Sequence, residues 1–158
     1  MAKFIYRMQN ILSLDEKLED QAKMEYAAQQ AVVNEEIEKE EGYRRRREQY
    51  MEEARALRGD ALSVKDLEAS TRAIDIMKGM IEDQHKVVLK EEDKLEAKRA
   101  ALEEAMKDRK TQEKLKEKAF DEFKAELAME ESKEIDQLTS YTYGIKRQAD
   151  GRKRTGDN

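Results

Sequence analysis

The residues of this chain that could do chemistry are one histidine, His85, the carboxylates of 37 acidic residues, and a run of four arginines, Arg44–Arg47. A zinc site needs several Cys or His ligands, and the chain has no Cys and no second His. A catalytic triad needs a histidine that is positioned by a folded pocket. The six Gly residues are scattered and form no phosphate-binding loop such as GxGxxG. We therefore expect no enzyme activity, no metal and no cofactor.

The charged residues instead suit a solvated surface. They make up 44 % of the chain, and the net charge of −5 gives no general attraction to nucleic acid. Arg44–Arg47 lies between the acidic stretch 35–41 and Glu48, and four consecutive residues point around the whole helix. No apolar run approaches the roughly 20 residues that span a bilayer, and residues 1–10 lack the apolar core of a secretory signal. We expect a cytoplasmic protein.

The elements that position these side chains are predicted to be helices, because aliphatic residues recur at every seventh position. The six members of this series are Leu67, Ile74, Ile81, Val88, Leu95 and Leu102. Such a repeat keeps one apolar stripe on one side of a helix, which must be buried against another helix. High charge and 6 % aromatic residues would also fit disorder, but the repeat and the absence of Pro favour long helices. The fold class is therefore all-α.

A single turn divides the chain into two predicted helices. Gly59-Asp60 is the only turn-like dipeptide in the middle of the chain, and the turn is expected over residues 59–63. Ser63 and Asp66 then form a helix start in which each satisfies a free backbone N–H. The second helix is predicted from Val64 to about residue 140. A basic, disordered tail is expected over residues 144–158.

Two starts are open for the first helix, which is expected to end near residue 58. The apolar spacing from Phe4 onward permits a helix that begins near Lys3. Ser13 and Glu16 match a capping box, which would start the helix there and leave residues 3–12 as a docked lead-in. The residues alone do not separate these two interpretations.

A short turn makes the two helices antiparallel, so the numbers of facing residues should have a constant sum. A sum of 124 pairs Leu57 with Leu67, Tyr50 with Ile74, Tyr43 with Ile81, Ile37 with Val87 (Val88 adjoins), Ala22 with Leu102, Leu18 with Met106 and Phe4 with Phe120. We therefore predict one antiparallel two-helix coiled-coil hairpin over residues 1–143. In this register, the second helix is longer and overhangs the first. A lone helix is marginal in water, so the overhang is expected to need a partner.

Three stretches resemble the family of the flagellar export protein FliJ. They are Phe4-x-x-x-Met8-x-x-Ile11-Leu12-x-Leu14 with Glu19-x-x-Ala22-x-x-Glu25, the stretch Ala105–Lys118, and Glu130-x-x-Lys133-Glu134-x-Asp136. The resemblance implies a non-enzymatic part of the bacterial flagellar type III export apparatus that resembles the central stalk of rotary ATPases. It also implies a stalk that inserts into the ring of the export ATPase FliI, contacts the export gate protein FlhA at the inner membrane, and serves export chaperones.

The resemblance also implies two partner-binding sites. By position, the gate contact would use Tyr43, Tyr50, Ile74, Ile81 and His85. Lys78 stands where the family has an apolar residue, and Arg46 where it can carry Tyr. Ile74 and Ile81 fit equally well as plain seam residues, whereas tyrosines suit interfaces because they join apolar area to a polar tip. The ATPase contact would lie at the other end, with Glu130, Lys133, Glu134 and Asp136, which also fit an ordinary solvated charge run.

Two other classes of protein fit the helical pattern. A prefoldin-like holdase chaperone would need β-hairpins for assembly, and the residues between the helices hold no strand-like run. A generic coiled-coil scaffold would use two chains, and not two helices of one chain, to form the seam. Sedimentation distinguishes these cases, because a monomer of 18.5 kDa favours the stalk and an obligate dimer counts against it.

Overall fold

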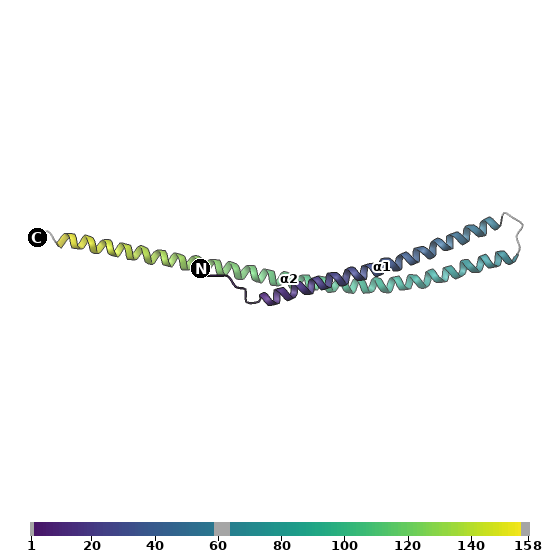
Figure 1. Ribbon diagram of the computed structural model, residues 1–158, viewed down its shortest axis with the longest axis horizontal. Coiled ribbons are helices and arrows are strands. Elements are labelled where there is room, and N and C mark those ends of the chain that lie inside the picture. The colour runs from purple at the N-terminus through teal and green to yellow at the C-terminus, as the bar shows by residue number, and fades with distance from the viewer. Residues whose placement is uncertain (1, 59–63, 156–158) are drawn as a thin grey trace. The chain divides into compact units, whose positions relative to one another are not determined.

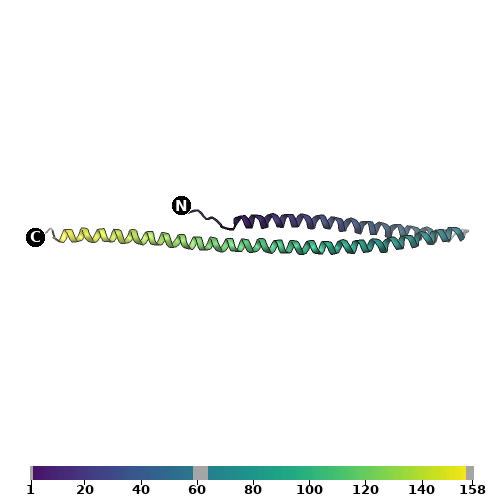
Figure 2. The same cartoon turned by 90° about the horizontal axis from the view of Figure 1, so that it is seen from below.

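The computed structural model describes residues 2–58 and 64–155, which form two helices, α1 (Gln9–Leu57) and α2 (Val64–Thr155). The chain divides into two units: unit 1 comprises residues 1–13 and 110–158, and unit 2 comprises residues 14–109. In unit 2, α1 and α2 lie side by side and run in opposite directions (Figures 1 and 2). The all-α helical hairpin with a longer second helix is confirmed, since α1 has 49 residues and α2 has 92.

The helix starts agree only in part with the sequence prediction. α2 begins at Val64 as predicted, while Ser63 and the turn at 59–63 lie outside the described residues. α1 begins at Gln9, so neither of the two predicted starts is right. A docked lead-in, as in the second interpretation, is present but shorter than the predicted 3–12, since the non-helical segment 2–6 lies against α2 through Phe4 and Tyr6.

The end of α2 differs from the prediction. The helix continues to Thr155, so the expected end near residue 140 and the expected disordered tail from Gly144 are wrong for the described residues. Gly144 and Gly151 both take a helical backbone, since no described residue has positive φ. Each Gly costs about 1 kcal/mol relative to Ala in a helix, but the Lys, Arg, Gln and Ala residues around them are good helix formers. No Pro interrupts the segment.

The core of unit 2 is a seam in which the less exposed residues of both helices alternate in steps of three and four. The predicted series on α2 lies in this seam, and Ile81, which is 6 % exposed, and Val88 are its most buried members. A second series alternates with the first on α2 and consists of Ser70, Met77, Gln84, Glu91, Lys98 and Ala105. On α1 the seam includes Val33 and Ala54 but also Glu19 and Glu40. The seam is therefore partly polar, and no described side chain is completely enclosed.

The predicted register is confirmed to within a few residues. In the hydrogen-bonded pairs that join the two helices in unit 2, the residue numbers sum to values between 120 and 128: Gln29–Glu91, Glu36–Gln84, Glu25–Lys98, Glu40–His85 and Glu19–Arg109. The predicted pairing of Leu18 is wrong, because Leu18 is 47 % exposed and its neighbour Glu19 is buried. Val87 is likewise exposed, and Val88 takes the seam position.

Candidate partner-binding surfaces

Two glutamine–glutamate pairs, here called the reciprocal Gln–Glu pairs, join α1 to α2 in unit 2. Nε2 of Gln84 on α2 donates to the backbone carbonyl oxygen of Glu36 on α1 at 2.9 Å and to its Oε2 at 2.5 Å. Seven residues away on each helix the direction reverses. Nε2 of Gln29 on α1 donates to the carbonyl oxygen of Glu91 at 3.0 Å and to its Oε2 at 2.6 Å. Polar pairs of this kind fix the register of a coiled coil.

These hydrogen bonds also set the protonation of the two carboxylates. The hydrogen bond from Gln84, followed by one from Lys39, lowers the pKa of Glu36 below its ordinary value. The hydrogen bond from Gln29 is the largest cause of the lowered pKa of Glu91. A donor that bonds to the ionised form favours that form. Both groups therefore stay ionised to a lower pH than an ordinary glutamate does.

Two ion pairs continue the polar part of the seam toward the end of unit 2. Nζ of Lys98 lies 3.2 Å from Oε2 of Glu25, and its hydrogen bond lowers the pKa of that carboxyl. Arg109 donates through Nε to Oε2 of the buried Glu19, which also pairs with Lys23 at 3.3 Å. Burial raises the pKa of Glu19, but the hydrogen bonds from Arg109 and Lys23 outweigh it and the pKa is lowered.

The five residues expected to contact the export gate all lie in unit 2, but they are not equally accessible. Tyr43, Tyr50 and Ile74 are half-buried along the seam, and His85 is exposed beside it. Ile81 is a buried seam residue and offers little surface to a partner. Of the two interpretations of Ile81, the seam is therefore the one that the structure favours.

His85 contacts α1 through a residue that was not predicted from the sequence. Its Nδ1 lies 2.9 Å from Oε1 of Glu40, which is buried in the seam and lies 3.3 Å from Nη2 of Arg44. A carboxylate only accepts hydrogen bonds, so Nδ1 of His85 is the donor in this contact. In the sequence, the only sign that Glu40 lies in the seam is its position seven residues after Val33, which is also a seam residue of α1.

Arg47 also departs from the sequence interpretation, which placed the whole run Arg44–Arg47 on a solvated face. Arg47 is half-buried at a seam position between Tyr43 and Tyr50. Its Nε is buried and has no hydrogen-bond partner among the described residues. The long aliphatic part of an arginine can cover apolar surface while the charged end reaches water. Arg47 therefore brings positive charge to the same stretch of the seam as the two tyrosines.

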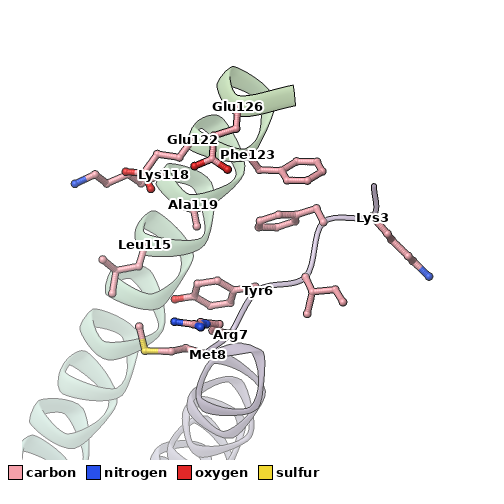
Figure 3. Close-up of a pocket in the computed structure, with 12 residues that line it drawn as sticks. Lys3, Tyr6, Arg7, Met8, Leu115, Lys118, Ala119, Glu122, Phe123 and Glu126 are labelled. Atoms are coloured by element: carbon pink, nitrogen blue, oxygen red, sulfur yellow. The ribbon is translucent and has the colours of Figure 1, made fainter. Parts of the chain in front are cut away.

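In unit 1 the N-terminal segment lies against α2 and forms a shallow aromatic groove with it. The ring of Phe4 packs against Phe120 and Phe123, with centroids 5.1 and 5.5 Å apart, and Tyr6 Oη donates to Oε1 of Gln112 at 3.0 Å. The predicted pairing of Phe4 with Phe120 is confirmed. Figure 3 shows the segment and the facing side of α2, which enclose an open groove of about 890 Å³. Ile5, between the two docked rings in sequence, is 80 % exposed.

The residues expected to contact the ATPase lie on the part of α2 that follows this groove. Glu130, Lys133, Glu134 and Asp136 are all exposed. Every described side chain from residue 128 to 153 is exposed as well. This part of unit 1 is a helix with no other segment of the unit packed on it (Figures 1 and 2). The structure brings these four residues together only as neighbours on one helix.

The described residues contain no group of three or more His, Cys, Asp or Glu residues that could hold a metal ion. Neither α1 nor α2 has, in its described residues, a stretch that is long and apolar enough to cross a membrane.

Comparison with known proteins gives one family and one fold relative. The family model described as "Flagellar FliJ protein" matches residues 4–148. A solved structure, described as that of a putative YscO homolog, CT670, from Chlamydia trachomatis, aligns with a TM-score of 0.58 and 20 % sequence identity. The alignment covers 92 % of this chain and 99 % of that chain, and at this identity it shows a shared fold. No curated protein matches the chain. Because the family model spans nearly the whole sequence, this chain belongs to the flagellar FliJ protein family.

Proposed function

We propose that this chain is the stalk of a flagellar type III export apparatus, inserting into the ring of the export ATPase FliI and linking that ring to the export gate protein FlhA. Membership of the FliJ family makes the chain a component of a type III export apparatus. The observation that carries the finer proposal is the exposed part of α2, residues 128–153, which no other segment of unit 1 covers. A lone helix of this kind is marginal in water and is stabilised when a partner surrounds it.

The ATPase-binding site of this proposal consists of Glu130, Lys133, Glu134 and Asp136 on that exposed helix. The charged side chains are exposed and can form ion pairs with the wall of such a ring. Ion pairs of this kind steer and orient a partner more than they add affinity.

The gate-binding site consists of Tyr43, Tyr50 and His85, with Ile74 beside them. Ile81 supports this surface from within the seam and is not proposed to touch the partner. Tyrosines are enriched at the centres of interfaces, and Tyr43 and Tyr50 are both only half-buried. Service to export chaperones is a further part of the proposal, which the family resemblance supports.

The experiment is a pull-down of FliI and of FlhA with purified variants of the full chain. The pair Tyr43→Ala/Tyr50→Ala should weaken gate binding, and a truncation after Leu127 should weaken ATPase binding. The matched control is Tyr26→Ala, which removes a half-buried seam tyrosine of unit 2 away from the proposed patch. The assignment of both sites is wrong if neither change affects either partner, or if Tyr26→Ala weakens gate binding as much as the tyrosine pair does.

The two other classes of protein have no observation in their favour. The seam of unit 2 is filled by α1 and α2 of one chain, as a hairpin requires and a two-chain scaffold does not. The described residues contain no β-strand of the kind that a prefoldin uses for assembly.

A further inference from the structure

The exposed part of α2 carries an apolar stripe that nothing in unit 1 covers. Residues 137–145 contain no charged side chain, in a protein that is 44 % charged. Leu138 and Tyr141 in this run are 66 % and 70 % exposed, and Ile145 is exposed too. Their spacing of three and four residues puts all three on one face of the helix. Tyr143 is 69 % exposed but lies about 200° around the helix from Tyr141, at 100° per residue, and so faces the other way.

The charge on the two sides of this run is opposite. Residues 126–136 hold five acidic side chains and one basic one, a net charge of −4. Residues 146–153 hold four basic side chains and one acidic one, a net charge of +3. The exposed helix is therefore acidic before its uncharged centre and basic after it. When two such helices lie side by side in opposite directions, the acidic part of each faces the basic part of the other.

We propose that two copies of this chain associate through the exposed part of α2, with the two helices antiparallel and the uncharged run at the centre. When the residue numbers of facing positions sum to about 283, Leu138 of each copy faces Ile145 of the other and Tyr141 faces Thr142. The acidic residues from Glu130 to Asp136 then lie along the basic stretch 146–153 of the second copy. The contact is isologous, so the same pairs form twice about a two-fold axis.

The charge order selects the antiparallel arrangement. A parallel pair would place the acidic stretch of one helix against the acidic stretch of the other, and like charges at facing positions are destabilising. At the flank of the stripe, Glu131 of one copy lies near Lys153 of the other only when the helices run in opposite directions. Both side chains are exposed and lie on the same side of the stripe. The dimer is thus specified by electrostatics and stabilised by the apolar stripe.

Only four large apolar side chains per copy take part, the three of the uncharged run and Ile135 three residues before Leu138, so the association is weak and reversible. An interface along about 22 residues of helix is about 33 Å long, at 1.5 Å per residue, and belongs to the small class of transient interfaces. The dimer covers the same helix that holds Glu130 and Glu134. If the proposed ATPase site is right, self-association and insertion into the ring exclude each other. The dimer itself does not depend on that function.

The first test is sedimentation equilibrium of the full chain over a wide concentration range, in the absence of any partner. We expect reversible formation of a dimer from the 18.5 kDa monomer. Tyr141→Glu should raise the dimer dissociation constant about tenfold or more, because it places a charge in the centre of the interface. Tyr143→Glu, the same change at an equally exposed tyrosine on the opposite face, should leave it unchanged. A chain that is monomeric at every concentration overturns the proposal, as does a dimer that Tyr143→Glu disrupts as strongly as Tyr141→Glu.

The second test is a charge exchange that reports on direction. Lys153→Glu and Glu131→Lys should each weaken the dimer, since each opposes like charges at the flank. The double variant Glu131→Lys/Lys153→Glu should restore it, because both charges of each pair are reversed. Failure of the double variant to recover more than the single variants contradicts the antiparallel register. Circular dichroism of each variant checks that the helix content is unchanged.

The third test uses the absence of Cys from the chain, which makes single cysteines unambiguous. Thr142→Cys places a thiol next to its own copy at the two-fold axis and should form an intermolecular disulfide under mild oxidation. Leu138→Cys should not, because position 138 faces Ile145 of the other copy, and the two introduced thiols are too far apart along the helices to reach each other. Efficient cross-linking of Leu138→Cys with none for Thr142→Cys would show a parallel pair and overturn the proposal.

Discussion

One side-chain nitrogen of Gln84 on α2 joins both the backbone carbonyl oxygen and the carboxylate of Glu36 on α1. Gln84 occupies a position of the seam where a coiled coil ordinarily has an apolar residue. A slip of the two helices by one heptad would move Gln84 away from Glu36 and also separate Gln29 from Glu91. The reciprocal Gln–Glu pairs thus reduce apolar burial in the middle of unit 2 and define a single register.

The first prediction concerns this register. Gln84→Ala should lower the free energy of unfolding by about 1–2 kcal/mol, because the half-buried Glu36 carboxylate loses a hydrogen-bond donor. The control is Gln137→Ala, the same change at an exposed position of α2, which should have almost no effect. Urea denaturation followed by circular dichroism measures both. Equal effects of the two variants would show that the pair contributes nothing to stability.

The second prediction concerns acid. The pKa values of Glu19, Glu25, Glu36 and Glu91 are lowered in the folded chain, so the unfolded state binds more protons as the pH falls. The stability from these groups is present above their unfolded pKa, about 4.3, and is lost as the pH falls through the lower folded values. Thermal unfolding should therefore show little change from about pH 7 to 5 and a falling midpoint below about pH 4.5. Glu36→Gln/Glu91→Gln should flatten this fall, and an unchanged slope would exclude these two groups as its source.

The third prediction concerns the lead-in segment of unit 1. Phe4→Ala removes both ring contacts with α2 and should release residues 2–8, so that their amides exchange faster and trypsin cuts sooner after Arg7. Ile5→Ala, at the exposed neighbouring position, should change neither rate. Hydrogen exchange by mass spectrometry measures the effect. If the amides of residues 2–8 exchange in both variants at the rate of the original chain, the ring contacts of Phe4 do not hold the segment against α2.

The fourth prediction concerns two glycines inside the helices of unit 2. A Cβ built at Gly42 or Gly79 meets no atom within 4 Å, and neither glycine has positive φ. Gly42→Ala and Gly79→Ala should therefore each raise the free energy of unfolding by about 0.5–1 kcal/mol. Ala28→Gly, at an exposed position of α1, should lower it by a similar amount. Thermal unfolding of the three variants checks the size and the sign.

The sequence was sufficient for the helical class, the start of α2 and the register, because aliphatic residues at seven-residue spacing mark a buried stripe. It did not show that Gln84 and Glu91 belong to the seam, since such residues are common on exposed faces and only a facing partner shows their role. The start of α1 at Gln9 follows a segment that docks on α2 through Phe4, and such a tertiary contact is not visible in the local sequence pattern. The predicted end of the second helix near residue 140 was wrong because Gly144 is tolerated within the helix.

For the candidate sites, the sequence supplied positions but not accessibility. Ile81 was placed correctly on the hairpin, yet the structure buries it, and only the packed partner helix could show that. Glu40 was missed because its single signal was a place in a seven-residue series that also contains the charged residues Glu19 and Arg47, and that does not read as an apolar stripe in the sequence. The four residues of the proposed ATPase site fit an ordinary solvated charge run in the sequence, and the structure likewise shows them exposed on one helix.

The seven-residue repeat on both helices of unit 2 makes the length of this hairpin a modular quantity. Each heptad adds about 10 Å, and a heptad removed from α1 together with the facing heptad of α2 leaves every remaining pair opposite its original partner. The separation between residues near the turn and residues near the other end of unit 2 can therefore change in fixed steps while the side chains at both ends stay the same. The seam therefore determines the length of unit 2 in steps of one heptad, and its polar pairs fix which residues face each other.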